Sequence, residues 1–210
     1  MKLYDFRGPP SPRRVRIFLA EKGLEIETET VNTTEGEQFS EEFKALNPHC
    51  TVPVLELDNG TAISSIDAIN RYIEEIHPEP PLFGRSPEER AEINNWCHYL
   101  NVNGIMAVAE AVRNSVERLK GRAVTGSRPI EQIPELAERG RKRILYFFED
   151  LEKQLSDGRE FIMGDTYSVV DCGAFVVVDF SRVAKVTVPD EMTNLKRWHA
   201  AMSERPSASA

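Results

Sequence analysis

The stretch Asn47-Pro48-His49-Cys50-Thr51-Val52-Pro53-Val54-Leu55-Glu56-Leu57 combines an apolar strand pattern with a proline near its start. Proline has no backbone N–H donor and is excluded from strand interiors, so Pro53 marks the end or edge of a strand. X-Pro bonds also tolerate the cis form, which here would turn the carbonyl and N–H of Val52 outward beside the sheet. An extended ligand can add itself to a sheet edge through such a backbone pair. The sequence therefore predicts a docking site for a small peptide at Val52.

On both sides of this stretch the sequence predicts elements in the order βαβαββα. Ser11 has the position of an N-cap, with Pro12 at the first helical position of the first helix. The expected elements are a strand at 2–6, a helix from 11 to 23, a half-exposed strand at 24–31, a short helix at 40–46, a hairpin of 52–57 and 61–63, and a helix at 65–76. An α/β domain is therefore expected over residues 1–77.

The proline-dense residues 78–85 form the expected linker, and residues 86–210 form an all-helical second domain. Ser86 opens a long helix to about Gly121 with a capping box. A polar loop is expected at 123–132 and further helices at 134–155 and 168–178, the second opened by a capping box at Ser168. Because the run to Val178 is apolar nearly all round, this helix is expected at the centre of the second domain.

The composition excludes several classes of function. With 26 basic and 34 acidic residues the formal net charge is −8, which argues against a nucleic-acid surface. No run approaches the about 20 apolar residues of a membrane span, and no signal-peptide core begins the chain, so a cytoplasmic protein is expected. Cys50, Cys97 and Cys172 form no CxxC pair and no metal-ligand spacing with the histidines. Reduced thiols and no metal site are expected.

Several sequence fragments, in their order and spacing, resemble the cytosolic glutathione S-transferase family, in particular bacterial theta- or nu-like members of the serine type. The fragments are Val15–Leu24, Asn47–Pro48, Val52–Leu55, Gly60–Thr61, Ala68–Ile69 with Tyr72, Ser168–Asp171 and Arg205–Ser207. The resemblance implies the glutathione S-transferase fold: an α/β thioredoxin-like N-terminal domain that holds glutathione, followed by an all-α C-terminal domain that shapes a pocket for an electrophile. It also implies a homodimer, with glutathione as co-substrate.

The chemistry of this family needs a donor for the glutathione thiolate at the N-terminus of the first helix, because the thiolate is the nucleophile. Serine-type members carry a Ser-Pro-x-x-Arg frame, and an ungapped match places Pro9 at the serine position. Ser11 lies two residues later and is the catalytic candidate, if the preceding turn bulges to bring it forward. The alternative, compatible role is that Ser11 caps its own helix. Arg7, Arg13, Tyr4 and backbone N–H groups of the turn are further candidates.

The resemblance also implies positions for the rest of glutathione. The backbone of Val52, next to Pro53, would pair with the cysteinyl part. Gln38 matches a position that binds the glycine carboxylate in theta-like members, the alternative being a surface glutamine. An acidic residue followed by a hydroxyl usually holds the γ-glutamyl end, and Ser65 and Ile66 stand at those positions.

The γ-glutamyl end would be held differently in this chain. Ser65, with the N–H groups of the following helix, would meet the γ-glutamyl carboxylate. The usual partner of the ammonium group is missing, and Asp67 is its substitute. The alternative for Asp67 is an exposed acid that the helix dipole favours in a first turn.

Three functions compete. The first is a glutathione transferase for detoxification that attacks a small hydrophobic electrophile, with Trp96, Tyr99, Met106 and Val112 lining the electrophile pocket unless they are core residues. The second is a non-catalytic, transferase-like binding or regulatory module, which the departures from the family pattern favour. The third is thiol–disulfide or dehydroascorbate reduction, which needs a cysteine at the first helix, and none precedes Cys50. The first is the function that the sequence favours.

Overall fold

The computed structural model describes residues 1–210, which separate into two units. Unit 1 contains residues 1–80 together with the short segments 125–128 and 209–210. Unit 2 contains residues 81–124 and 129–208. The chain thus passes from unit 1 to unit 2 between Pro80 and Pro81, inside the proline-dense stretch expected to be a linker.

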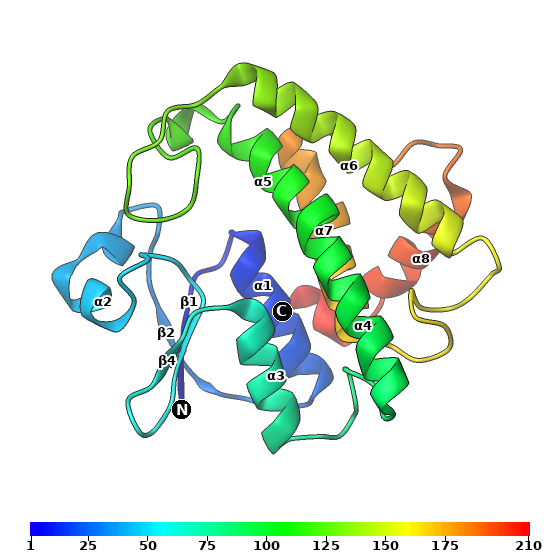
Figure 1. The fold of residues 1–210 in the computed structure, drawn as a ribbon, viewed down its shortest axis with the longest axis horizontal. Helices are drawn as coiled ribbons and strands as arrows, with labels where there is room; N and C mark the ends of the chain where they lie inside the picture. Colours follow the sequence, from blue (N-terminus) through cyan, green and yellow to red (C-terminus); the bar gives the residue numbers. More distant parts are fainter. The chain divides into compact units, whose positions relative to one another are not determined.

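Unit 1 has the predicted order βαβαββα (Figure 1). Its elements are β1 (Lys2–Asp5), α1 (Pro10–Glu21), β2 (Glu27–Thr30), a 3-10 helix η1 (Glu37–Phe39), α2 (Glu41–Leu46), β3 (Val54–Glu56), β4 (Ala62–Ile63) and α3 (Ile66–Ile76). The sheet order is β2-β1-β3-β4. β1 pairs in parallel with β2 and antiparallel with β3, and β4 is antiparallel to β3. This small mixed sheet with its helices confirms the predicted thioredoxin-like domain.

The two faces of the sheet carry different clusters, because successive side chains of a strand alternate between faces. Leu3 is paired with Leu55, and both are fully buried. Tyr4 is paired with Val54 and points to the opposite face, where Val54 packs in a cluster with Val31 and Phe43. The helices α1 and α3 lie side by side (Figure 1) and bury their apolar residues. The side chain of Val52 also packs against the cluster of Val31, Phe43 and Val54.

The start of α1 differs from the prediction. Ser11 is not the N-cap: Pro9 has that position and Pro10 is the first helical residue. The predicted capping role of Ser11 is therefore wrong. The reason is that proline tolerates the first turn of a helix, so the tandem Pro9-Pro10 extends α1 forward instead of delaying it.

Unit 2 is helical throughout, as predicted (Figure 1). Its helices are α4 (Pro87–Tyr99), a π-helical segment η2 (Leu100–Ile105), α5 (Met106–Arg113), α6 (Pro134–Gln154), α7 (Val169–Phe180) and α8 (Thr193–Ser203). Short 3-10 helices are η3 (Glu117–Leu119), η4 (Ser181–Ala184) and η5 (Pro206–Ser209), of which η5 ends on Ser209 of unit 1. The small Gly140 allows α6 to approach α5 closely, since a Cβ there would lie 2.5 Å from the backbone N of Ala111.

The helix that starts at Pro87 ends earlier than the predicted Gly121. The C-cap of its last part, α5, is Asn114. The side-chain amide of Asn114 donates to the carbonyl of Glu110, and its oxygen accepts from the backbone N–H of Ile133. These bonds compete with continuation of the helix, which the apolar pattern alone does not reveal.

Both predicted capping boxes are confirmed, at Ser86 with Glu89 and at Ser168 with Asp171. The second box opens α7, in which every residue from Val169 to Val178 is buried, so this helix is central to unit 2 as predicted. Asp171 is fully buried and accepts hydrogen bonds from the backbone N–H groups of Ile162 and Ser168, the Ser168 hydroxyl and the Trp198 indole. This carboxylate therefore joins α7, α8 and the turn before α7.

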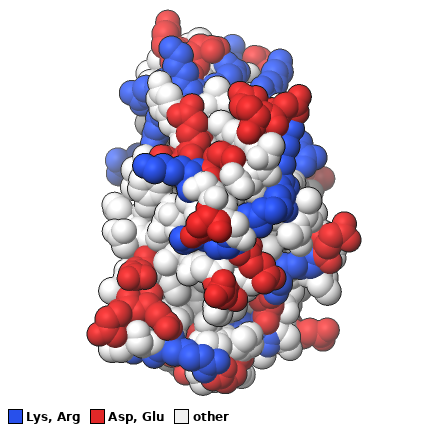
Figure 2. Space-filling model, turned by 90° about the vertical axis from the view of Figure 1, so that its right-hand side faces the viewer, with Lys and Arg blue, Asp and Glu red and all other residues white.

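Acidic and basic side chains are interspersed over the face seen in Figure 2, without a large basic area. None of the helices is long and apolar enough for a membrane span. The three cysteines are buried and form no disulfide, and no cluster of three potential metal-ligating side chains is found.

Candidate functional site

Four of the predicted site segments meet at one edge of the sheet of unit 1. Parallel pairing of β1 with β2 places the ends of both strands at this edge. Antiparallel pairing brings the start of β3 and the end of β4 to the same edge, since Tyr4 faces Val54 and Leu55 faces Ile63. The segments that follow β1, β2 and β4 carry Ser11, Gln38 and Ser65, and the segment before β3 carries Val52. The topology therefore assembles a candidate site from residues far apart in sequence.

Val52 presents an unused backbone at this edge. The Val52–Pro53 peptide bond is cis, which confirms the prediction. The strand β3 begins only at Val54, and neither the N–H nor the carbonyl of Val52 is hydrogen-bonded within the chain. The Val52 side chain packs against the cluster of Val31 and Phe43, which fixes the position of the residue. An extended peptide can therefore pair with Val52 as an additional strand.

The loop before Val52 is held by Asn47, which is only 2% exposed. Its side-chain amide donates to the Thr51 carbonyl oxygen over 2.8 Å and to the Thr51 hydroxyl over 3.1 Å. Its side-chain oxygen accepts from the backbone N–H of His49 over 3.1 Å, and its backbone carbonyl accepts from the backbone N–H of Cys50. Cys50 has a positive φ of 54°. One buried side chain thus sets the geometry of the segment that leads into Val52.

Ser11 is the second residue of α1, half-buried, and its hydroxyl makes no hydrogen bond within the chain. A helix begins with four backbone positions whose N–H groups have no partner in the helix. In α1 these positions are Pro9, Pro10, Ser11 and Pro12, and proline has no N–H. Ser11 therefore carries the only free backbone N–H of the first turn, together with a hydroxyl that can also donate.

The other candidates for the thiolate donor are less suitable. The Tyr4 hydroxyl already donates to the Glu56 carboxylate over 2.9 Å, and burial together with this bond raises the pKa of Tyr4. Arg7 is exposed in the turn before α1, and Arg13 lies in the second turn of the helix. Ser11 is the candidate that combines a free hydroxyl with the helix N-terminus.

Ser65 is the N-cap of α3, and its exposed hydroxyl makes no capping hydrogen bond. Ile66 and Asp67 follow in the first turn, so their N–H groups point out of the helix. Asp67 lies 3.5 Å from the guanidinium of Arg14, whose side chain is buried in α1. Asp67 is therefore held in place by a cation, and is more than an exposed acid favoured by the helix dipole.

Gln38 lies in η1 and is only 6% exposed, so the alternative of a surface glutamine is wrong. Its buried side-chain oxygen has no hydrogen-bond partner in the chain. A buried amide without a partner is rare in proteins, because an unsatisfied polar group is costly. Gln38 is thus suited to meet a polar group of a ligand or a bound water.

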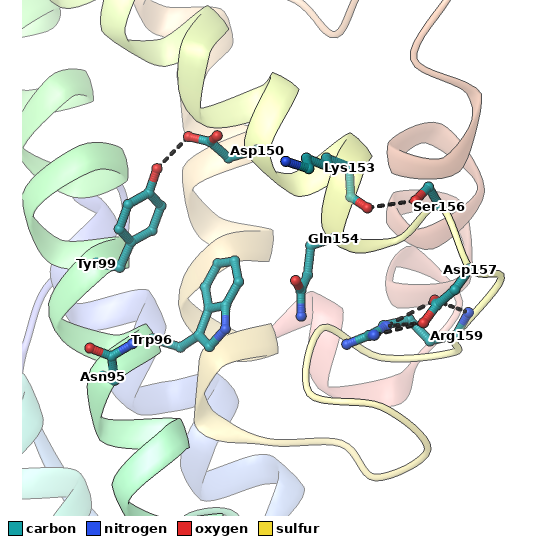
Figure 3. Close-up of a pocket in the computed structure, with 9 residues that line it drawn as sticks. All are labelled: Asn95, Trp96, Tyr99, Asp150, Lys153, Gln154, Ser156, Asp157 and Arg159. Carbon is teal, nitrogen blue, oxygen red and sulfur yellow. Dashed lines mark hydrogen bonds and ion pairs between the residues drawn. The ribbon is translucent and has the colours of Figure 1, made fainter.

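In unit 2, Trp96 and Tyr99 line a cavity of about 560 Å³ (Figure 3). Their rings meet edge to face with centroids 5.5 Å apart. The remaining lining residues come from α4, the end of α6 and the turn after it: Asn95, Asp150, Lys153, Gln154, Ser156, Asp157 and Arg159. The cavity therefore has an aromatic wall and a rim that contains four charged side chains.

The Tyr99 hydroxyl donates to the Asp150 carboxylate across this cavity (Figure 3). Burial and this hydrogen bond raise the pKa of Tyr99 to about 12. Tyr99 therefore stays a neutral phenol at physiological pH. On the rim, Arg159 pairs with Asp157 and lowers the pKa of that carboxyl to about 2, so this pair stays ionised.

The other two expected pocket residues have different environments. Met106 begins α5 with 58% of its surface exposed and does not line the cavity. Val112 is buried in the core of unit 2, which agrees with the alternative of a core residue.

Both units match models of one protein family. Residues 10–76 match the glutathione S-transferase N-terminal domain, and residues 134–201 match the glutathione S-transferase C-terminal domain. Glutathione S-transferase 2 of Saccharomyces cerevisiae is 32% identical over 99% of this chain and 87% of its own length. The chain belongs to the glutathione S-transferase family. These matches confirm the predicted family, the predicted fold and the prediction that the chain is a glutathione transferase enzyme.

Two further relatives extend the comparison of this family member. A glutathione S-transferase domain-containing protein of Marinobacter aquaeolei VT8 superposes with a TM-score of 0.90 at 34% identity, covering 99% of both chains. The maleylacetoacetate isomerase of Mus musculus is 29% identical over 99% of this chain and 83% of its own length.

Three features of the site in this family member are not predictable from the sequence: the contacts of Arg14, the contacts of Asn47 and the position of residues 125–128. The contacts of Arg14 and Asn47 depend on tertiary packing. The segment 125–128 was expected only as part of a polar loop, but it clusters with unit 1. The single available signal was the glycine and proline content of this loop, which indicates a defined turn but not its neighbour.

Proposed function

We propose that the chain is a glutathione S-transferase that activates the glutathione thiolate for attack on a small hydrophobic electrophile. The observation that carries this proposal is the unpaired backbone of Val52, directly before the interior strand β3, at the end of the sheet where α1 and α3 begin. Glutathione is a peptide, and a peptide is the ligand that such an unpaired backbone accepts.

Ser11 is the proposed catalytic residue. A free thiol has a pKa of about 8.5, so most of it is protonated at neutral pH. The Ser11 hydroxyl, its backbone N–H and the positive end of α1 favour the charged thiolate, which lowers the pKa of the bound thiol. With an aryl halide, the thiolate sulfur forms a bond to the ring carbon and the halide leaves with the bonding electrons.

The other groups bind and orient glutathione in this proposal. Val52 pairs with the cysteinyl part beside Pro53. Ser65 and the N–H groups of Ile66 and Asp67 receive the γ-glutamyl carboxylate at the N-terminus of α3.

The two remaining ligands meet the ends of the tripeptide. The Asp67 carboxylate, held by Arg14, receives the γ-glutamyl ammonium group. The Gln38 amide N–H group donates to the glycine carboxylate, and its buried oxygen accepts from an N–H group of the ligand or from a water.

The cavity of Trp96 and Tyr99 is the proposed electrophile pocket. Met106, which is exposed and does not line the cavity, is not part of it. The two rings supply apolar contact area, and because the O–H of Tyr99 already donates to Asp150, the phenol offers a ligand only its oxygen as an acceptor. The charged rim favours an electrophile that carries a polar group in addition to its apolar body.

A homodimer in the cytoplasm, with a role in detoxification, completes the proposal. Val102, Met106 and Tyr146 are large exposed apolar residues on η2, α5 and α6, which pack against one another. Exposed apolar residues on helices that pack against one another are candidates for an interface. Three cysteines without a disulfide fit a reducing compartment. Sedimentation equilibrium of the wild type and of Tyr146→Lys tests the dimer, and a monomeric wild type would contradict it.

Isomerisation of maleylacetoacetate is a second candidate, because the mouse isomerase matches nearly the whole chain. A direct assay with maleylacetoacetate separates it from conjugation.

Glutathione titration by calorimetry, followed by conjugation of a generic aryl halide, tests the main proposal. Saturable binding with glutathione-dependent turnover is expected. Absence of binding at millimolar glutathione would reject it in favour of the non-catalytic binding or regulatory module. Binding with isomerisation and without conjugation would favour the second candidate.

A further inference from the structure

The loop of residues 121–130 is closed at its base by two backbone hydrogen bonds. The N–H of Ala123 donates to the Ile130 carbonyl over 3.0 Å, and the N–H of Ile130 donates to the Gly121 carbonyl over 2.9 Å. Gly126 at its tip has a φ of 128°, a conformation that suits glycine. A loop with a closed base holds its tip as a defined structure, and such loops are frequently functional.

The tip of this loop, residues 125–128, is part of unit 1 although its base belongs to unit 2. A Cβ built on Gly126 would lie 3.9 Å from the carbonyl oxygen of His49. His49 belongs to the loop that Asn47 holds directly before Val52. The tip therefore lies beside the segment that precedes the peptide-binding edge.

This position corresponds to one end of the proposed ligand. A strand that pairs antiparallel with residues 51–53 runs in the opposite chain direction. Its C-terminal end then lies beside the residues that precede Val52, and its N-terminal end lies toward the start of α3. Glutathione has its glycine carboxylate at the C-terminal end, so this carboxylate would lie next to the loop of residues 47–51.

A carboxylate at that end needs a cation, and the chain supplies one. Arg128 is exposed, and its guanidinium forms no ion pair or hydrogen bond within the chain. Lys44, the cation closest in sequence to the same loop, is already paired with Glu41. A guanidinium is also well suited to a carboxylate, because its fork of N–H groups matches the two oxygens.

We propose that Arg128, carried into unit 1 by the tip of the loop, binds the glycine carboxylate of glutathione. The inference rests on the proposed function and adds to the neutral amide of Gln38 a cation from outside the thioredoxin-like sequence for the glycine end. Because Arg128 is exposed, the contribution is that of a solvent-screened ion pair, about two- to fivefold in affinity at low salt.

Calorimetric titrations with two ligands test this assignment. Glutathione carries the glycine carboxylate, and γ-glutamylcysteine lacks the glycine. For Arg128→Gln we expect the dissociation constant for glutathione to rise about two- to fivefold while that for γ-glutamylcysteine stays unchanged. Arg128→Lys keeps the charge and is expected to retain most of the affinity. Arg118→Gln is the matched control, because Arg118 is an exposed arginine of unit 2 on the 3-10 helix η3.

The outcomes separate this inference from the function on which it rests. If wild-type protein binds glutathione and Arg128→Gln binds it equally well, Arg128 does not contact the tripeptide. An equal loss for both ligands would also overturn the assignment, since it would place the arginine away from the glycine. If the wild type binds neither ligand at millimolar concentration, the proposed function itself fails.

Discussion

The buried side-chain amide of Asn47 donates a 2.8 Å hydrogen bond to the carbonyl oxygen of Thr51, one residue before Val52. The bond fixes the chain that leads into Val52, so the proposed glutathione-binding segment depends on a residue that need not touch the ligand. Asn47 is accordingly a positioning residue.

Asn47→Ala is expected to weaken glutathione binding and to destabilise the protein by about 1–3 kcal/mol, because buried partners lose their hydrogen bonds. Calorimetry measures the affinity and urea unfolding measures the stability. Asn59→Ala is the control, since the Asn59 side-chain oxygen accepts from the backbone N–H of Thr61 in the exposed turn between β3 and β4, as that of Asn47 does from His49. Equal affinities of the Asn47 and Asn59 variants for glutathione would show that the loop does not position Val52.

Ser11→Ala removes the hydroxyl but keeps the only free N–H of the first turn of α1. The pKa of the bound glutathione thiol is therefore expected to rise by about one unit, which corresponds to about 1.4 kcal/mol. Thiolate absorbance of the complex as a function of pH measures this shift, and conjugation at neutral pH falls accordingly. Ser11→Pro also removes the N–H and is expected to raise the pKa further.

The control for both Ser11 variants is Ser203→Ala, which alters an exposed serine of α8. A thiol pKa that is the same in wild type and Ser11→Ala would exclude the hydroxyl as the donor.

The Tyr99–Asp150 hydrogen bond predicts a pH dependence. The pKa of Tyr99 is raised to about 12, which means that the folded state holds this proton more tightly than the unfolded chain does. Its stabilising contribution is present below the unfolded pKa of about 10 and is lost as the pH rises toward 12.

Alkaline difference titration of the wild type against Tyr99→Phe isolates the phenol of Tyr99. In Asp150→Asn the same difference is expected at lower pH, because the negative acceptor is gone. If Tyr99 has the same pKa in the wild type and in Asp150→Asn, the hydrogen bond to Asp150 does not raise the pKa of Tyr99.

Asp171→Asn is expected to destabilise unit 2 by about 2–4 kcal/mol, because an amide nitrogen would face donors that now bind a carboxylate. Burial raises the pKa of Asp171, although the four hydrogen bonds oppose this shift. Urea unfolding measures the loss, with the exposed Asp165→Asn as control. A midpoint unchanged in both variants would mean that the hydrogen bonds to Ile162 and Trp198 contribute nothing.

Much of the fold was predictable because it follows local rules. Three local signals each predict one structure, and the structure confirms all three. They are Pro53 at the beginning of an apolar run, the capping boxes at Ser86 and Ser168, and the all-apolar run that ends at Val178. The start of α1 was not predictable in the same way. Serine and proline both favour helix starts, and the choice between Pro9 and Ser11 as N-cap depends on the preceding turn.

The site was predictable only in part, for the same reason. Val52 follows from a local signal, whereas the ion pair of Arg14 with Asp67 joins two helices across 53 positions of sequence. Nothing in the sequence near Gln38 reveals its burial. The placement of residues 125–128 beside His49 is a tertiary contact with no local pattern.

The closed loop of residues 121–130 lies between the two stretches that define the family, 10–76 and 134–201. Its base is held by two backbone hydrogen bonds and by the Arg113 guanidinium, which donates to the carbonyl of Arg122, and none of these bonds involves residues 125–128. The residues of the tip can therefore be exchanged while the base stays closed. Under the proposed role of Arg128, exchange of four residues at the tip would retune which low-molecular-weight thiols the enzyme accepts. Thiol preference and electrophile preference would then diversify independently within one scaffold.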